Sequence, residues 1–219
     1  MKMAAMGVRM HSGWGALVVV ANEDGRVNVV ARERIEVIDE KAGGKRQPYH
    51  RAKNLALNEA EKYLAGCAAE SKRLATGSIR GLTEDLQNRS YRLAKCAVLT
   101  ASGRELPPLA GILAAHPLIH TAEGEFFRNA ICSACEGLRL SILRVREREV
   151  ESAAKASLGR STATVMKQIA YAGKSLGPPW TQDHKKAALA AWMALHERKG
   201  VAKGSRGKSG DPSSADVED

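Results

Sequence analysis

Five acidic residues could do chemistry if the fold gathered them: Glu33, Glu105, Glu123, Glu125 and Asp183. Carboxylates brought together can hold divalent metal ions, which activate water and stabilise a leaving oxygen. Acids in the first turn of a helix also stabilise that helix through its dipole, and this accounts equally well for Glu123, Glu125 and Asp183. The acids alone therefore leave both interpretations open.

Histidine and cysteine spacings give no clear metal site. His116 and His120 are four residues apart, but Pro117 between them is expected to break the helix that would align them. Cys132 and Cys135 form a CxxC inside a helical pattern, and no second pair with metal-ligand spacing follows. We therefore predict that these cysteines are ordinary buried or surface thiols, and that Cys67 and Cys96, which lie on apolar faces, are core thiols.

The chain is strongly basic, with a net charge of +10 at pH 7 from 34 Lys and Arg against 24 Asp and Glu. Such a balance favours a polyanionic partner, although solvated surface charge is the alternative. The basic residues group in two stretches, at Arg9, Arg32, Arg34, Lys45, Arg46, Arg51 and Lys53, and at Lys185, Lys186, Arg198 and Lys199. With two Phe and four Tyr, the chain lacks a stacking platform, so we expect no sequence-specific reading of bases.

The length of 219 residues allows one sizeable core. We expect a single domain over residues 1–199 and a disordered tail over 200–219, where almost nothing is apolar. No apolar run approaches the roughly 18 residues that cross a bilayer, and Arg9 and His11 interrupt the N-terminal one. These features predict a cytoplasmic protein with no membrane partner.

The elements that must position these residues alternate between strands and helices, which indicates an α/β protein. Strands are expected at 14–21, 26–37, 93–100 and 138–145, with a hairpin turn at 22–25 and a bulge at Glu33. Helices are expected at 50–67, 79–87 after a break at Gly77, from Thr121 to Gly137, at 161–175 and at 181–197. Residues 41–48 are expected to form a loop.

Three stretches resemble the RuvC-type Holliday-junction resolvase branch of the ribonuclease H-like fold. They are GVRMHSGWGALVV near the N-terminus, FFRNAICSACEGLRLSIL in the middle, and PPWTQDHKKAALAAWMALH near the end. The resemblance covers about residues 6–197. It implies a mixed sheet, with an antiparallel N-terminal hairpin and parallel strands, flanked by helices.

The resemblance also implies four carboxylates that hold two metals, and most of them are missing here. Arg9, Met10 and His11 stand where the first acid belongs, and the stretch from Thr100 to Ser102 has no acid. In the last helix, Asp183 matches one acid, while Lys186 stands about where a second belongs. One carboxylate cannot hold two metals, and the cations at these positions would repel them. The resemblance thus implies a degenerate nuclease site.

We therefore predict a non-catalytic domain that binds structured DNA or RNA, or acts as a scaffold in a nucleic-acid complex, and that needs no cofactor. The candidate nucleic-acid-binding residues are Arg9, Arg32, Arg34, Arg51, Lys53 and Lys186. One alternative is an active Mg²⁺- or Mn²⁺-dependent nuclease with relocated acids, in which Asp183 would be catalytic. A further alternative is a protein-interaction module, and a homodimer is compatible with each.

Two further expectations concern the surroundings of Asp183. The resemblance places Asp183 beside the turn from Arg9 to Ser12, because the last helix of this fold packs near the end of the first strand. It also places His11 and His184 close to each other, so that they could bind a single metal with Asp183.

Overall fold

The computed structural model of the chain describes residues 1–39, 46–101 and 105–197. The strands are β1 (Lys2–Met10), β2 (Trp14–Glu23), β3 (Arg26–Glu36), β4 (Tyr91–Thr100) and β5 (Ser141–Arg146). The helices are α1 (Pro48–Ala52), α2 (Leu57–Asn88), α3 (Leu109–Ala114), α4 (His116–Gly137), α5 (Val150–Leu158), α6 (Thr162–Leu176) and α7 (Gln182–His196), with short 3-10 turns at Glu147–Glu149 and Gly159–Ser161. The tail expected over 200–219, most of the loop expected over 41–48, and Lys45, Arg198 and Lys199 lie outside the described residues.

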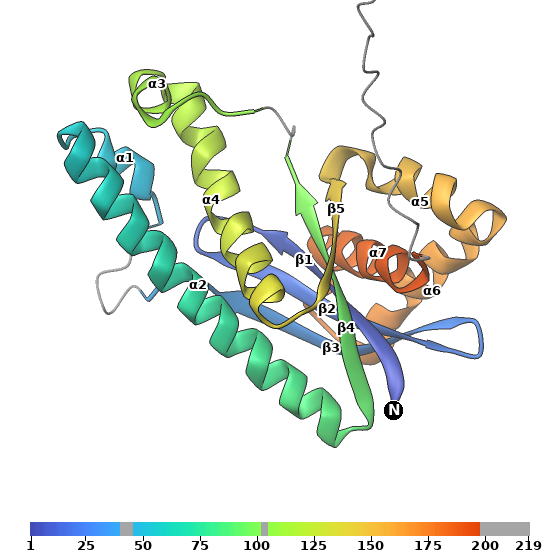
Figure 1. The fold of residues 1–219 in the computed structure, drawn as a ribbon. Coiled ribbons are helices and arrows are strands. Elements are labelled where there is room, and N and C mark those ends of the chain that lie inside the picture. Colours follow the sequence, from blue (N-terminus) through green and yellow to red (C-terminus); the bar gives the residue numbers. More distant parts are fainter. Residues whose placement is uncertain (40–45, 102–104, 198–219) are drawn as a thin grey trace, which may run out of the picture.

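The five strands form one mixed sheet in the order β3-β2-β1-β4-β5 (Figure 1). β1, β2 and β3 pair antiparallel, whereas β4 pairs parallel with β1 and β5 pairs parallel with β4. This is the strand order of the ribonuclease H-like fold, and it confirms the predicted fold class. The predicted position of the 93–100 strand, between the first strand and the 138–145 strand, is also confirmed.

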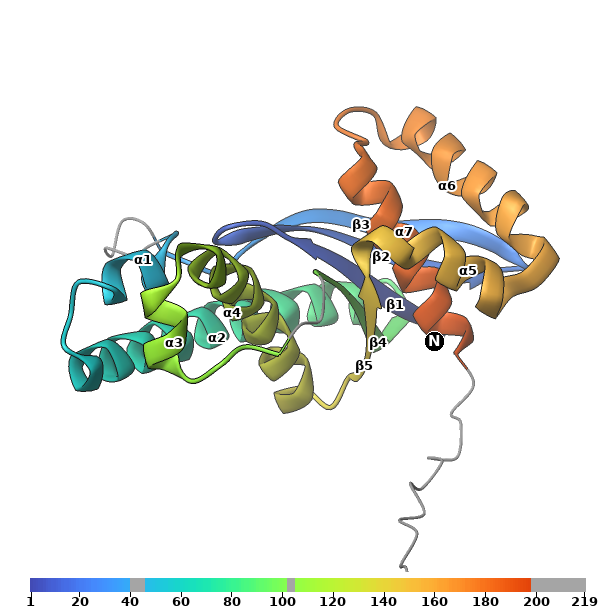
Figure 2. The ribbon, with the colours of Figure 1, turned by 90° about the horizontal axis from the view of Figure 1, so that it is seen from above.

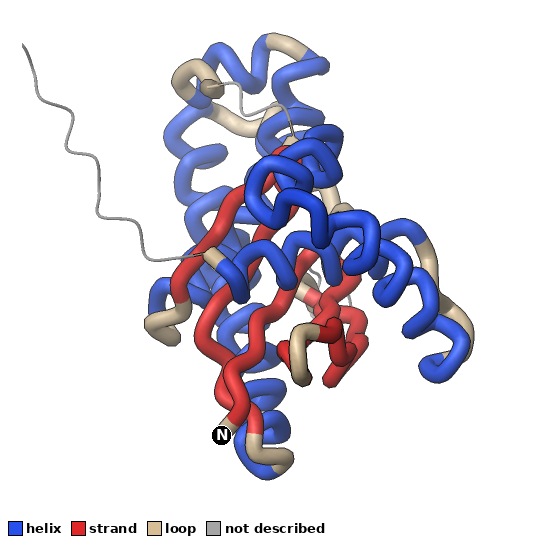
Figure 3. The backbone as a smooth tube through the Cα atoms, turned by 90° about the vertical axis from the view of Figure 1, so that its right-hand side faces the viewer, coloured by secondary structure: helices blue, strands red, loops and turns tan. Residues whose placement is uncertain are grey.

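Helices cover both faces of the sheet (Figures 2 and 3). Alternate residues of a strand point to opposite faces, so β1 contributes to two cores. Met6 and Val8 pack with α2 and α4 on one face, while Ala5 packs with α7 on the other. Because both faces are covered, β1 and β2 are apolar over most of their length, and so is β4 from Cys96 to Leu99, as buried strands must be.

Helix α7 lies unusually close to the sheet because the facing residues are small. A Cβ atom added at Gly7 would overlap the backbone carbonyl oxygen of Ala187, so only glycine permits this approach. Every residue from Ala187 to Ala194 is buried, because α5 and α6 pack against the outer side of the helix. This packing holds the first turn of α7 close to the end of β1.

The bulge in the hairpin lies away from the predicted position. The pairing of β2 with β3 shifts between Val19 and Val20, whose partners are Ala31 and Val29, whereas Glu33 pairs regularly with Leu17. An extra residue in one strand reverses which face each later side chain takes. Val29 accordingly packs with the α7 core, while Ile35 beyond the bulge packs with α2, so the bulge divides the apolar side chains of this strand between the two faces of the sheet.

Three helix boundaries also differ from the prediction. Residues 50–67 belong to two helices, α1 and α2, and α2 continues through Gly77 to Asn88 without a break. A glycine costs a helix about 1 kcal/mol, which the buried residues Ala75, Ile79 and Leu82 outweigh. α4 begins at His116 rather than near Thr121. Among the described residues, every helix is too short or too polar to span a bilayer.

Candidate functional site

The parallel strands end at one edge of the sheet, and α7 begins beside that edge. β1 ends at Met10, β4 at Thr100 and β5 at Arg146, and crevices beyond the carboxyl ends of parallel strands are where α/β proteins usually bind ligands. Among the described residues, five side chains that are charged or titratable meet there. We call them the Arg9 cluster, and they are Arg9, His11, Glu147, Asp183 and Lys186.

The Arg9 guanidinium lies between two carboxylates. Its Nη1 atom is 3.1 Å from Oδ1 of Asp183, and its Nε atom is 3.0 Å from Oε1 of Glu147. The Nε contact is an ion pair without the alignment of a hydrogen bond, since this buried atom has no hydrogen-bond partner among the described residues. The side chains of Arg9, Glu147 and Asp183 are all about three-quarters buried, with exposures of 23%, 27% and 27%.

Asp183 also contacts the residue after β1. Nε2 of His11 lies 2.9 Å from Oδ2 of Asp183, so the two carboxylate oxygens face different partners. This contact confirms that Asp183 lies beside the turn from Arg9 to Ser12. Glu147 also has two partners, but both contact the same oxygen, because Nζ of Lys186 lies 3.0 Å from the Oε1 atom that Arg9 contacts.

These contacts change the acidity of Glu147. Burial by itself raises the pKa of this carboxyl, but the hydrogen bond from Lys186 and the contact with Arg9 outweigh it, so the pKa is lowered from its ordinary value. Glu147 is therefore held ionised by two cations. The cluster balances its charges internally, with two carboxylates against one guanidinium and one ammonium.

An aromatic contact extends the cluster toward β3. The rings of His11 and Trp14 stack with centroids 4.2 Å apart, and Cζ of Arg34 lies 3.8 Å from the Trp14 ring centroid. Arg34 and Arg9 belong to the same row of the sheet, because both pair with Ala16 of β2. The Arg34 guanidinium is half exposed and also pairs with Glu36. It is thus positioned at the rim of the cluster.

His184 does not join His11 and Asp183. Its Nδ1 atom lies 2.9 Å from the Thr181 hydroxyl and accepts the backbone N–H of Thr181, which makes it part of the N-terminal cap of α7. Burial and, next, the charge of Arg32 lower the pKa of His184. A single-metal group of His11, His184 and Asp183, which the resemblance made possible, is absent from the described residues.

The predicted nucleic-acid-binding residues do not form one surface. Arg9, Arg34 and Lys186 belong to the cluster or its rim, but Arg32 donates to the backbone carbonyls of Gly177 and Pro179 and so supports the segment before α7. Arg51 and Lys53 lie at α1, which packs with α2 and α4 on the other face of the sheet.

Sequence reasoning missed Glu147 and its basic neighbours Arg146 and Arg148. Arg146 is the last residue of β5 and the other two follow it directly, and both arginines are well exposed while they pair with Glu149. An alternating run of Arg and Glu immediately after a parallel strand was the signal that could have located them, since such residues meet at the edge where ligands bind.

The remaining acids lie away from Asp183. Glu33 and Glu105 are exposed, and Glu125 pairs with Arg128 at 3.1 Å. Glu123 is buried, and its Oε1 atom accepts the backbone N–H groups of Tyr49 and His50. Burial raises the pKa of Glu123 even though these hydrogen bonds oppose the shift. The relocation of Glu33, Glu105, Glu123 or Glu125 to the cluster is therefore not observed.

The cysteines are free thiols. Cys96, Cys132 and Cys135 are buried between the sheet and α4, and Cys67 is half-buried. Burial raises the pKa of Cys132 to about 11, so this thiol is unreactive at neutral pH. The interpretation of the CxxC as core thiols is confirmed.

Comparison with known proteins gives similarity in structure only. No family model matches the chain, and no curated protein is similar to it in sequence. RuvC of Thermus thermophilus is similar in structure with a TM-score of 0.48 and 12% identity, over 89% of this chain and 94% of that one. T. thermophilus RuvC in complex with a Holliday junction substrate gives a TM-score of 0.47 and 11% identity, over 89% and 93%. A Ppx/GppA family member from Aquifex aeolicus gives a TM-score of 0.33 and 11% identity, over 71% and 39%.

Proposed function

We propose that this chain binds structured nucleic acid at the edge where β1, β4 and β5 end, and that it does so without metal-dependent cleavage. The observation that carries the proposal is the Arg9 guanidinium in contact with both carboxylates of the cluster, at 3.0 and 3.1 Å. In a two-metal nuclease, carboxylates in such a position hold the metal ions. In this chain the Arg9 guanidinium, and not a metal ion, is the cation between the two carboxylates.

The charges of the cluster oppose the binding of two divalent ions. Asp183 and Glu147 each already contact Arg9, and Lys186 contacts Glu147 as well. A divalent ion 4 Å from one guanidinium would meet a repulsion of about 8 kcal/mol at an effective dielectric constant of 20. Two carboxylates cannot offset two such ions beside two fixed cations, so we propose that neither Mg²⁺ nor Mn²⁺ is required.

The rim of the cluster supports the binding of phosphates. Arg34, Arg146 and Arg148 have side-chain exposures of 50%, 47% and 70% and surround this edge from β3 and from the end of β5. Each is paired with an acidic neighbour on the surface, and such pairs exchange readily for phosphate because they contribute little energy. Contacts of this kind position a backbone without reading bases.

The test is a fluorescence-anisotropy titration of a four-way DNA junction and of a linear duplex without divalent ions. We expect affinity to fall steeply with salt, because neutralised phosphates release counterions. The Arg34→Glu/Arg148→Glu variant should weaken binding to both substrates at least tenfold. The matched control is Arg80→Glu/Arg92→Glu, which makes the same charge change at exposed positions of α2 and β4. Equal losses in both variants, or no binding at low salt, would contradict the proposal and favour a protein-interaction module.

A second candidate function is that of a metal-dependent nuclease. The observation that favours it is the position of Glu147, which contacts the same guanidinium as Asp183. Glu147 supplies a carboxylate that joins Asp183 through Arg9. If nucleic acid displaced Arg9 toward a phosphate, these two acids would become free to hold one Mg²⁺ or Mn²⁺ ion. Cleavage that depends on Asp183 distinguishes this candidate from the first.

A further inference from the structure

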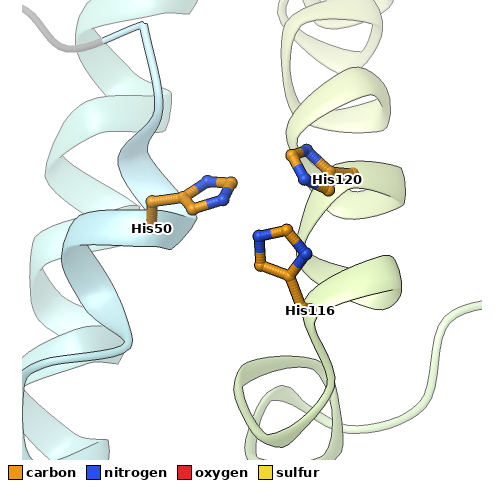
Figure 4. Close-up of side chains that lie close together, drawn as sticks. All are labelled: His50, His116 and His120. Carbon is orange, nitrogen blue, oxygen red and sulfur yellow. The ribbon is translucent and has the colours of Figure 1, made fainter.

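Three histidines from two helices face one another on the side of the sheet that α7 does not cover. His50 comes from α1, and His116 and His120 come from the first two turns of α4 (Figure 4). One potential ligand atom from each residue lies within 4.8 Å of the others. The expectation that Pro117 would separate His116 from His120 was wrong. Pro117 lies in the first turn of α4, where its missing N–H is not needed.

From this geometry we propose that His50, His116 and His120 form a binding site for one zinc-class divalent ion, such as Zn²⁺, Co²⁺ or Ni²⁺. Imidazole nitrogens suit these metals, whereas Mg²⁺ and Ca²⁺ prefer oxygen ligands. The three rings already contact one another edge to face or at a tilt, with centroids 4.4, 4.9 and 5.4 Å apart. No carboxylate or cysteine has to be recruited to complete three ligands.

A buried carboxylate orients the first of these ligands. Oε1 of Glu123 lies 3.2 Å from Nδ1 of His50, and the Glu123 side chain is 7% exposed. A carboxylate accepts hydrogen bonds, so Nδ1 carries the proton and Nε2 keeps a lone pair for a metal. Carboxylates that hold a metal-ligating histidine in this way are a regular feature of metal sites.

Glu123 also carries one buried oxygen atom that its neighbours leave unsatisfied. Its second oxygen, Oε2, is buried and has no hydrogen-bond partner among the described residues. A buried carboxylate that is only partly satisfied is costly, and a nearby divalent ion would offset that cost through His50. This observation is independent of the histidine spacing, and it points to a cation at the same place.

The site can close around a metal without moving the backbone far. Two ligands of a tetrahedral ion lie about 3.4 Å apart when each bond is about 2.1 Å, so the ligand atoms would have to approach by roughly 1.4 Å at most. His116 and His120 are exposed and can rotate by this amount. Their exposure also leaves the fourth position to water or an added ligand, as in open zinc sites.

Metal binding would join α1 to α4. α1 and α4 otherwise meet through the hydrogen bonds that Glu123 accepts from Tyr49 and His50, and through one small apolar group around Ile119 in which Tyr49 takes part. A metal held by both helices would therefore stabilise this end of the molecule. The site is separate from the Arg9 cluster, since α4 and α7 cover opposite faces of the sheet.

The test is calorimetric titration of the untagged protein with Zn²⁺, together with the visible spectrum of the Co²⁺ form. We expect one ion per chain, a rise in Tm with metal, and Co²⁺ bands of a nitrogen-ligated site without intense thiolate-to-metal absorption. His116→Ala/His120→Ala should lose binding, and Glu123→Gln should weaken it about 10- to 100-fold. The control is His196→Ala, which removes an exposed histidine of α7.

Several results would overturn the proposal. One is the absence of stoichiometric Zn²⁺ and Co²⁺ binding by the wild-type protein. This result does not depend on whether any variant folds. Another is binding that survives unchanged in His116→Ala/His120→Ala. A third is a Co²⁺ spectrum dominated by thiolate, which would assign the metal to cysteines.

Discussion

Nε2 of His11 lies 2.9 Å from Oδ2 of Asp183, although 172 residues separate the two in the chain. Together with the contact between Arg9 and the other carboxylate oxygen, this contact fixes the first turn of α7 to the end of β1 and to the residue that follows it. The first and last elements of the described structure are thus joined by polar contacts as well as by the packing of Gly7 against Ala187. The contacts between the end of β1 and the start of α7 lead to four predictions about stability, acidity and metal binding.

Asp183→Asn should lower the free energy of unfolding by about 1–3 kcal/mol, because it removes one of the two carboxylates that contact the largely buried Arg9, and the carboxylate that contacts His11. Urea denaturation measures the change. The control is Asp85→Asn, which breaks an exposed pair with Arg89 on α2 and should cost about 0–1 kcal/mol. Similar losses in both variants would show that the Arg9 cluster contributes no more than a surface ion pair.

Glu147 should make stability fall in acid. Its pKa is lowered in the folded protein, so its stabilising contribution is fully present above the ordinary value of 4.5 and is lost as the pH falls through the lowered value. The stability difference between wild type and Glu147→Gln, measured by urea unfolding, should therefore shrink from pH 7 toward pH 3. A difference that stays constant over this range would exclude the ion pairs as its source.

Gly7→Ala should destabilise the protein by about 3 kcal/mol or more, because the new methyl group would overlap a backbone oxygen of α7 that cannot rotate away. The matched control is Gly66→Ala in α2, where a Cβ atom meets nothing within 4 Å. That substitution should stabilise the helix by about 0.5–1 kcal/mol. Thermal unfolding followed by circular dichroism compares the two, and a tolerated Gly7→Ala would refute the close packing of α7 on β1.

Arg9→Asp should create a metal site that the wild type lacks, since it removes a cation and adds a carboxylate next to Asp183 and Glu147. In a His116→Ala/His120→Ala background, which removes the histidine group, millimolar Mn²⁺ should raise the Tm of Arg9→Asp but not that of Arg9→Ala. A matching rise with Arg9 unchanged would mean that the guanidinium does not exclude the ion.

Much of the fold could be predicted from local patterns. The Val-rich strand after Trp14, the Asp24-Gly25 turn and the Thr181 cap are short-range signals, and all three lie where expected. The bulge beside Val30 and the continuity of α2 through Gly77 could not be predicted in this way, because both depend on what packs against the element. In α2, packing outweighed the low helix propensity of Gly77. In the hairpin, packing placed the bulge beside Val30 and not at the polar Glu33.

The site was predictable only in part. The resemblance placed Asp183 beside the turn after Arg9, and the structure agrees. It gave no indication of Glu147, which enters the cluster because β5 runs parallel to β4 and ends at the same edge. The histidine group was missed because Pro117 was taken to end a helix that it in fact begins, and because His50 lies on another helix.

The most direct test of the central claim is a single-turnover assay with a labelled four-way DNA junction, excess protein and roughly 10 mM Mn²⁺, since a large excess of an ion fills even a weak site for it. The account predicts that the protein binds the junction and that the strands stay intact, for the wild type and for Asp183→Ala alike. Cleavage by the wild type that is lost in both Asp183→Ala and Glu147→Ala would contradict it, because the two carboxylates would then be metal ligands rather than partners of Arg9.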